Sequence, residues 1–291
     1  IHPTVKMRVR QIERVLKLPL PSVIRYCKEL EKEGILKKTT IVGISAYSAD
    51  RSSKKYLIEK RLFNIKHIIT THGGDLETLN KLPFKRQIAN FIFNNSDYIL
   101  FVSSYSKNIF KNLIKNEFKN NLEKKSLILP MGIHTKKLKN PTKKEKIEEI
   151  YNISLNKNLI FIGRLEERKG LTYLINAMPK ILNKFDVNLL ILGDGPIKSK
   201  LLNQVKKLNL ENNVKFFEHT VGKKKLDLLK LADILVIPSL AEGLPVTLLE
   251  GLTTGKVIIA TNVGGILDVI KNNYNGISIK SRDENEISNA I

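Results

Sequence analysis

The sequence predicts an α/β protein in which a doubly wound parallel sheet follows an incomplete sheet domain and a small N-terminal helical module. Six short runs of branched apolar residues alternate with helical stretches over residues 153–291. Such alternation is typical of a parallel sheet with helices on both faces. Residues 67–138 show the same pattern over fewer repeats, and residues 1–60 change to a helical pattern.

Residues 1–60 have the pattern of two helices and a hairpin. "VRQIERVLKLPLPSVIRYCKELEKEGILKK" contains a turn at Leu18–Pro21, and Ser22 is a suitable N-cap for a second helix that ends at Gly34. "ILKKTTIVGISAY" then has the apolar pattern of a strand pair. The segment resembles a winged helix-turn-helix of the archaeal transcriptional-regulator type. A small helical module that binds protein, or nothing, is the alternative.

The winged-helix resemblance implies that the second helix enters the major groove of DNA. Arg25 and Lys28 fall on the outward side of that helix, so they are the expected DNA contacts. Such modules usually pair to occupy two half-sites, and no dimerisation helix is evident here. We therefore expect weak, non-specific DNA binding that weakens steeply as salt is raised.

Residues 67–138 have the features of half a parallel α/β domain. "HIITTHGGDLETL" is an apolar strand that enters a turn and then a helix, and "SDYILFVSSYSKNIF" repeats this order. "KSLILPMGI" adds a short strand. We expect the second half of a parallel α/β domain whose first strands are missing. The polar stretch "KKLKNPTKKEKIEEI" that follows is predicted to be a solvated linker.

The strands expected in residues 153–291 are "NLIFIG", "VNLLIL", "NVKFF", "DILVIP", "KVIIA" and "GISI". Ligands of doubly wound sheets bind beyond the carboxyl ends of the strands. The loops after these strands are therefore the candidate binding loops, namely Gly163–Gly170, Gly193–Pro196, Pro238–Pro245 and Thr261–Gly265.

Two of these loops carry groups that suit a diphosphate bearing sugars. Arg164 and Lys169 follow the first strand, and both side chains bind phosphate oxygens well. Glu242 and the amides of Gly243 and Leu244 lie where a helix is expected to start, which is a natural site for an anion or a hydroxyl. The carboxylate would accept hydrogen bonds from sugar hydroxyls, while the cations and amides hold phosphate.

A second carboxylate, Glu250, follows Glu242 in an otherwise apolar or small-residue stretch, "AEGLPVTLLEGLTTGKVIIATNVGG". A helix is predicted to start near Pro245 and to stop near Gly255, where glycine suits a left-handed position. Glu250 then lies in mid-helix. A solvent-facing carboxylate there would be unremarkable, whereas a buried one needs a partner, because an unpaired buried charge is costly.

The motifs "GRLEERKG", "ILGDGP", "LADILVIPSLAEGLPVTLLEGLTTGKVIIATNVGG" and "PMGI" together resemble the retaining glycosyltransferases of GT-B fold called family 4. The resemblance covers roughly residues 67–291. It implies two Rossmann-like domains, of which residues 153–291 would bind the nucleotide-sugar donor. It also implies transfer of a sugar to a glycan or lipid-linked acceptor with retention of configuration.

The same resemblance implies roles for individual residues. The family's pair of glutamates matches Glu242 and Glu250, so Glu250 would bind the ribose hydroxyls of the donor. Glu242 would hold hydroxyls of the transferred sugar, with the two following amides beside it. Arg164 and Lys169 would neutralise the departing diphosphate. His72 matches the histidine that the acceptor-side domain lends to the donor sugar; a loop histidine with no such role is the alternative.

No cofactor is expected, because family members of this type are metal-independent. The sequence agrees, since it has neither an Asp-x-Asp at a strand end nor a Cys/His cluster with ligand spacing. It departs from the family in three places. The opening Gly-rich loop is missing, the C-terminal helices are cut off, and Glu218–His219 replace the usual glycine turn.

Net charge and cysteine content bear on partners and location. The net charge of +22 favours nucleic acid, anionic lipid or phosphorylated substrates as partners, or reflects only a lysine-rich solvated surface. The single cysteine, Cys27, excludes an internal disulfide and favours a reducing compartment. No apolar run approaches the roughly 18 residues of a membrane span, and no secretory leader is evident. We therefore expect a cytoplasmic protein with peripheral contact to the inner face of the membrane.

A rival hypothesis from another class is a DNA-binding transcription regulator whose α/β part senses a nucleotide-sugar or is an inactive glycosyltransferase-like domain. Such a sensor would need Arg164, Lys169 and Glu250 to hold its ligand. It would not need His72, which belongs to the acceptor side. A third hypothesis is an inactive fragment with a preserved donor domain.

Overall fold

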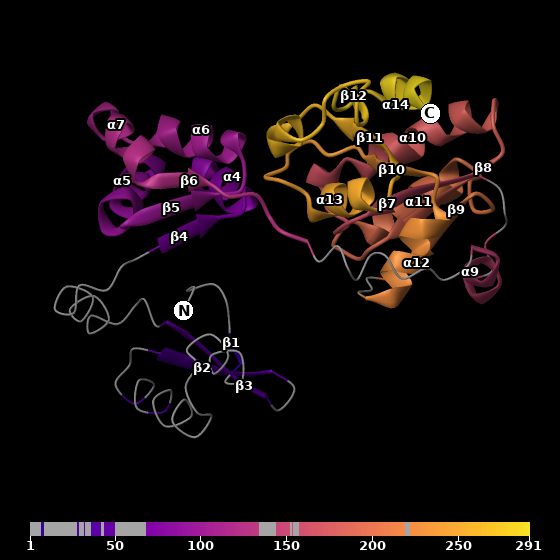
Figure 1. Cartoon of the computed structure of the whole chain (residues 1–291). Helices are drawn as coiled ribbons and strands as arrows, with labels where there is room; N and C mark the ends of the chain where they lie inside the picture. The colour runs from indigo at the N-terminus through magenta and orange to yellow at the C-terminus, as the bar shows by residue number, and fades with distance from the viewer. Residues whose placement is uncertain are drawn as a thin grey trace. The chain divides into compact units, whose positions relative to one another are not determined.

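The computed structural model of the chain describes residues 7–8, 28, 32, 36–41, 44–49, 68–133, 144–151, 153, 157–218 and 222–291 (Figure 1). The chain divides into two compact units. One unit comprises Ile1–Thr70, Gln87–Leu100 and Asn116–Leu127. The other comprises Thr71–Arg86, Phe101–Lys115 and Ile128–Ile291, and it holds every candidate site residue of the glycosyltransferase motifs.

The N-terminal strands form a sheet of three in the order β1-β3-β2, with β1 at Met7–Arg8, β2 at Leu36–Ile41 and β3 at Ile44–Ala49. Strands β2 and β3 are antiparallel, and Ile41 is opposite Ile44. This is the strand pair expected from "ILKKTTIVGISAY". Lys28 has helical backbone and is exposed, whereas Arg25 and most of the two predicted helices lie outside the described residues. The winged-helix prediction therefore stays a prediction.

A second sheet of three strands has the order β4-β5-β6. Its strands are β4 (Ile68–Thr71), β5 (Tyr98–Phe101) and β6 (Ser126–Ile128). The accompanying helices are α4 (Gly74–Lys81), α5 (Lys85–Asn95), α6 (Ser104–Leu113) and α7 (Asn116–Lys124). The strand-turn-helix order predicted for this stretch is present.

The third sheet has six parallel strands in the order β12-β11-β10-β7-β8-β9. They are β7 (Lys157–Ile162), β8 (Val187–Leu192), β9 (Val214–Phe217), β10 (Ile234–Ile237), β11 (Val257–Thr261) and β12 (Ile277–Ile279). Each strand coincides with one of the six apolar runs in the sequence. The prediction of a doubly wound parallel sheet is confirmed for this part of the chain.

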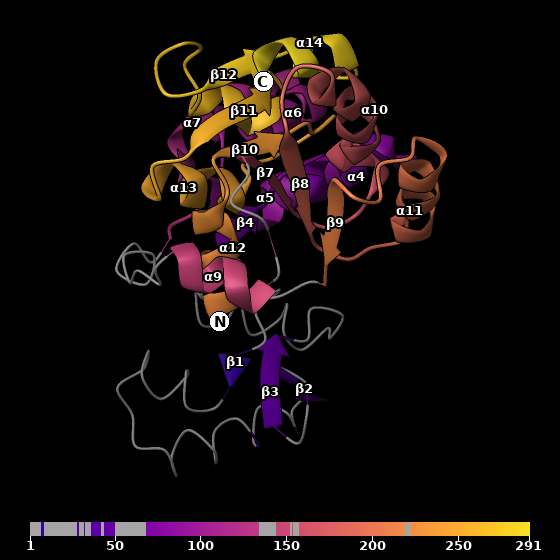
Figure 2. The ribbon, with the colours of Figure 1, turned by 90° about the vertical axis from the view of Figure 1, so that its right-hand side faces the viewer.

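Helices cover both faces of the six-stranded sheet (Figure 2). The helices are α9 (Lys144–Tyr151), α10 (Leu171–Leu182), α11 (Lys198–Lys207), α12 (Lys223–Leu231), α13 (Val246–Thr253) and α14 (Glu284–Ala290). Alternate strand residues point to opposite faces. Leu159 and Phe161 thus pack with α10, α11 and α14, whereas Ile160 packs with α9, α12 and α13. This division explains why the strands are apolar throughout.

The order of the strands reverses beside β7. Strands β8 and β9 lie on one side of β7, and β10 to β12 lie on the other. Because β7 and β10 are neighbours, the loops that follow them leave the same edge of the sheet side by side. A reversal of this kind is the place where doubly wound sheets bind ligands.

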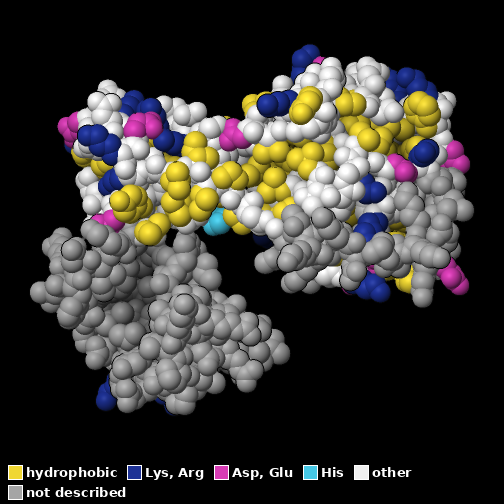
Figure 3. Space-filling view, in the orientation of Figure 1, with side chains coloured by type: hydrophobic (Ala, Val, Ile, Leu, Met, Phe, Trp, Pro, Cys, Tyr) yellow, Lys and Arg dark blue, Asp and Glu magenta, His cyan; other side chains and the backbone are white. Residues whose placement is uncertain are grey.

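Among the described helices, none is long and apolar enough to cross a membrane. On the face shown in Figure 3, the lysine and arginine side chains lie in small groups separated by polar and apolar side chains. The visible charge therefore has the distribution of a solvated surface rather than of one continuous basic patch.

Candidate active site

The loop after β7 delivers a lysine to the loop after β10. A short 3₁₀ turn, η1 (Glu167–Lys169), begins just beyond Arg164 and ends at Gly170. Gly170 has φ +66, and a Cβ there would lie 1.9 Å from the carbonyl oxygen of Pro238. Only glycine permits this approach of the two loops, and the turn directs Lys169 toward the loop after β10.

Lys169 forms an ion pair with Glu242, whose side chain is almost fully buried. The Lys169 Nζ atom lies 2.5 Å from Glu242 Oε1, and Ser239 Oγ donates to the same oxygen at 2.8 Å. Thr261 Oγ1 in turn donates to the Ser239 carbonyl oxygen at 2.6 Å. A buried carboxylate is costly without partners, and these contacts offset the cost of burying Glu242 at the sheet edge.

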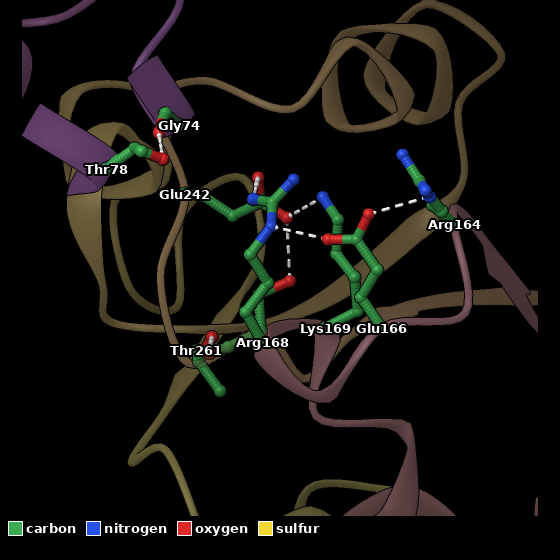
Figure 4. A network of polar contacts seen from close by, with 9 residues as sticks. Gly74, Thr78, Arg164, Glu166, Arg168, Lys169, Glu242 and Thr261 are labelled. Atoms are coloured by element: carbon green, nitrogen blue, oxygen red, sulfur yellow. Dashed lines mark hydrogen bonds and ion pairs between the residues drawn. The ribbon is translucent and has the colours of Figure 1, made fainter. Parts of the chain in front are cut away.

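Two arginines join this pair through a second glutamate (Figure 4). Arg164 Nε lies 2.8 Å from Glu166 Oε1, and Arg168 Nε lies 2.9 Å from Glu166 Oε2. The Arg168 guanidinium also comes within 3.9 Å of Glu242 Oε2. Arg164 is the outermost member, with 70% of its side chain exposed. The loops after β7 and β10 thus present three cations and two carboxylates in one connected network.

The backbone around Glu242 is fixed by the loop after β11. Gly264 has φ +58, and a Cβ there would lie 1.8 Å from the Glu242 carbonyl oxygen. The Gly265 amide donates to that same oxygen at 3.1 Å. These contacts give "NVGG" a structural role, because they set the position of the loop that carries the buried carboxylate.

The amides of Gly243 and Leu244 precede helix α13, for which Pro245 is the N-cap. Neither amide donates a hydrogen bond to another residue in the described ranges. Leu244 itself is buried in the core beneath the helix. Both residues are buried, so the anion or hydroxyl site expected at these amides stays a prediction.

Helix α13 ends close to the predicted limits, and its C-terminal Gly255 has φ +68. Glu250 lies in its second half and is neither solvent-facing nor unpaired. Lys225 Nζ, from the first turn of α12, lies 2.8 Å from Glu250 Oε1 and 2.6 Å from Glu250 Oε2. The sequence required a partner if this carboxylate were buried, and the structure supplies one.

His72 lies on the turn that follows β4 and is exposed. Its backbone N–H donates to both carboxylate oxygens of Asp75 at 3.1 Å. The next residue, Gly73, has φ +92, and a Cβ there would lie 2.2 Å from the Gly243 Cα atom. Within this compact unit, the histidine turn therefore packs against the residue that follows Glu242.

Glu77, on α4, is a further carboxylate near this network. Burial raises its pKa; the Arg168 guanidinium acts in the opposite direction, and the Glu242 carboxylate raises the pKa again. Its Oε1 atom is buried and has no hydrogen-bond partner among the described residues. Burial raises the pKa of Tyr105, and the Glu77 carboxylate raises it further.

Several of these residues were missed from the sequence: Ser239, Glu166, Arg168, Lys225 and Glu77. For Arg168 a signal existed, since it precedes Lys169 in "GRLEERKG" and a tight turn presents consecutive residues to one loop. Nothing in the local sequence marked Lys225 or Glu77, because each reaches the site only through tertiary packing. Within the described ranges, no three His, Cys, Asp or Glu side chains are placed to hold a metal ion.

The family model of the glycosyl transferases group 1 matches residues 143–291, about half of the chain. The chain belongs to this family. The matched range contains the loops after β7, β10 and β11, and therefore the whole Lys169–Glu242 network.

Relatives in the family span a longer chain than this one. An uncharacterised glycosyltransferase of Methanocaldococcus jannaschii is 30% identical over 236 residues, which cover 80% of this chain and 59% of that protein. The GDP-mannose-dependent alpha-(1-6)-phosphatidylinositol monomannoside mannosyltransferase of Mycobacterium tuberculosis is 25% identical over 233 residues, covering 77% and 59%. The chain thus spans less than two thirds of the length of these relatives.

The fold is shared with solved glycosyltransferases. The HepE protein of Anabaena, crystallised with UDP-glucose, superposes with a TM-score of 0.69 at 19% identity, covering 81% of this chain and 64% of that one. Its likeness confirms the predicted α/β fold of GT-B type with parallel sheets. The predicted roles of individual residues are not tested by it.

Proposed function

We propose that this group 1 glycosyltransferase moves a sugar from a nucleotide-sugar donor to a glycan or lipid-linked acceptor. The observation that carries the proposal is the pairing of Lys169 with Glu242 at the reversal of strand order, where two loops from neighbouring strands meet. A cation for phosphate and an acceptor for sugar hydroxyls stand there within one hydrogen bond of each other.

Each part of the donor has a matching group. Lys169 and Arg164 face the diphosphate, whose negative charge grows as the bond between the sugar C1 and the phosphate oxygen breaks. Arg168, which is held by Glu166, adds a third cationic side chain that can donate hydrogen bonds to the diphosphate. Glu242 accepts from hydroxyls of the transferred sugar, and Glu250, one helix further, accepts from the ribose.

Retention of configuration and independence from metal belong to the proposal. Three cationic side chains near one loop supply the charge stabilisation that a metal ion gives in other diphosphate sites. The turn at His72 packs against Gly243, beside the loop proposed to hold the donor sugar. This position supports the proposal that the turn contributes to the acceptor side of the site. A sensor of nucleotide-sugars would not need that turn beside the donor loop.

The mannosyltransferase relative uses GDP-mannose and a phosphatidylinositol monomannoside, according to its name. The structural relative binds UDP-glucose. Both suggest nucleoside diphosphate hexoses as the donors to try first, and the former suggests a glycolipid acceptor.

A thermal-shift screen of UDP-, GDP- and ADP-hexoses is the first test of the proposed function. The donor that raises the melting temperature most is then incubated with acceptor glycans and glycolipids, and released nucleoside diphosphate is measured by a coupled assay. Proton NMR of the product gives its anomeric configuration. Inversion at the anomeric carbon would refute retention, and the absence of any stabilising nucleotide-sugar would refute the donor assignment.

A further inference from the structure

The contact between Lys225 and Glu250 joins two helices on one face of the six-stranded sheet. Lys225 lies in the first turn of α12, and Glu250 lies in α13, 25 residues later. Their side chains are 20% and 15% exposed, so both charges are largely removed from water. A pair in such surroundings is screened less by salt than a surface pair.

The two oxygens of Glu250 differ in how they are satisfied. Oε1 accepts a hydrogen bond from Lys225 Nζ at 2.8 Å. Oε2 lies 2.6 Å from the same nitrogen but outside hydrogen-bonding geometry, and among the described residues it has no hydrogen-bond partner. The Lys225 ammonium therefore balances the charge of Oε2 without donating a hydrogen bond to it. Oε2 keeps its capacity to accept a hydrogen bond from another group.

Lys225 stands at an unfavourable position for a cation in its own helix. The first turn of α12 contains three lysines, Lys223–Lys225, and no acidic residue. The positive end of the helix dipole opposes a cation there. Among the described residues, Lys225 pairs with the carboxylate of Glu250, whereas Lys223 in the same turn is exposed to solvent.

We propose that Lys225 is a positioning residue for the donor's ribose, acting through Glu250; the inference rests on the ribose role proposed for that glutamate. Lys225 holds Oε1 and balances the charge of the carboxylate. The carboxylate thereby stays in one orientation, and its buried Oε2 is left as an unsatisfied acceptor for a hydroxyl of the vicinal diol. Removal of the lysine leaves a largely buried carboxylate without its counter-charge and without a fixed orientation.

This role differs from two others that the same contact would permit. A lysine that merely tied α12 to α13 would affect every ligand of the site equally. A lysine that occupied the ribose position would have to leave before the donor bound, and its removal would strengthen binding. The ribose hydroxyls distinguish the three cases, because only the positioning role predicts that removal of the lysine weakens binding of a nucleotide selectively when those hydroxyls are present.

The test uses the 291-residue chain and whichever of UDP, GDP and ADP stabilises it most, together with the 2′,3′-dideoxy form of that nucleotide. Calorimetry gives the dissociation constants of both forms. The parent should favour the ribonucleotide by about tenfold or more, as expected for hydrogen bonds to a charged acceptor. Lys225→Met should lose most of that preference and leave affinity for the dideoxy form within about twofold. Lys223→Met, which removes the same charge from the same turn, should keep the parental preference.

Four outcomes would overturn the inference. An unchanged preference in Lys225→Met, an equal loss for both nucleotides, or tighter ribonucleotide binding would each assign the lysine another role. Failure of the parent to bind any of the three nucleotides would remove the proposed function and this inference with it. Melting curves check that the variant folds. Lys225→Gln, for which the same result is expected, replaces the methionine variant if it does not.

Discussion

Lys169 and Glu242 are 73 residues apart in the sequence, and their side chains form a 2.5 Å ion pair at the edge of the six-stranded sheet. The contact exists because β7 and β10 are neighbours and each carries one member of the pair on the loop that follows it. Since Ser239 donates to the same carboxylate oxygen, the pair has a fixed geometry before any donor binds.

The cations of the β7 loop should contribute unequally to turnover. Lys169→Met should lower kcat by about a hundredfold or more, because removal of one preorganised charge at a developing anion has effects of this order. Arg164→Ala should have a smaller effect, since 70% of its side chain is exposed and its charge is screened by water. Steady-state kinetics measure both.

The matched control for these cations is Lys207→Met, at the exposed end of α11. It should leave kcat and KM unchanged. Parental rates in both loop variants would show that the β7 loop has only a structural role.

Glu250→Gln should weaken binding of the nucleotide-sugar, because an amide is a weaker acceptor than a carboxylate and leaves Lys225 without its counter-charge. A hydrogen bond to a charged group contributes about 1.5–3 kcal/mol, so the dissociation constant should rise about tenfold or more. Free sugar does not reach this part of the site and should bind as before. Calorimetry on both ligands decides the assignment, and equal donor affinity in parent and variant would refute it.

Glu77 should make stability depend on pH. Burial raises its pKa above the ordinary value of 4.5, so the folded chain holds the proton more tightly than the unfolded chain does. The folded state therefore loses stability as pH rises from about 4.5 through the raised pKa. Glu77→Gln has no proton to lose at this position. Its melting temperature should therefore rise relative to that of the parent as the pH is raised from 4 to 7.

Glu211→Gln, at an exposed position, serves as the control for Glu77. Its melting temperature should run parallel to that of the parent over the same pH range. A difference in melting temperature between Glu77→Gln and the parent that stayed constant over this pH range would contradict the raised pKa of Glu77.

The N-terminal segment should bind duplex DNA weakly if the winged-helix prediction is right. The expected contacts are Arg25 and Lys28, and the latter is an exposed helical residue. Affinity should fall by about 0.9 log units per log unit of salt for each phosphate neutralised. Gel shifts of the parent and of the Arg25→Ala/Lys28→Ala variant, over a series of salt concentrations, measure this. Equal binding by the two proteins would assign the affinity to the general positive charge of the chain.

The sheet that carries the site was predictable because its strands and loops are local features. Short continuous apolar runs mark the strands, and glycine marks the turn after a strand at Gly163 and the end of a helix at Gly255. Parallel strands bring their carboxyl ends to one edge, so Arg164, Lys169 and Glu242 could be assigned to one site before their distances were known.

The sequence did not show which side chains would form ion pairs with one another in the site. Lys225 is one of three consecutive lysines, and only the packing of α12 beside α13 selects it for Glu250. Burial and pairing depend on which elements become neighbours, and a single sequence carries little information about that.

Hydrogen exchange with and without the best-binding nucleotide-sugar tests the central claim most directly, because it reports where the donor binds. Bound donor should slow exchange of backbone amides in two segments, residues 163–170 and 239–250. Peptides from α14 (Glu284–Ala290), which lies on the other face of the sheet from α13, should exchange at an unchanged rate. Protection that spared both loop segments, while the donor was bound, would place the donor elsewhere and contradict the account.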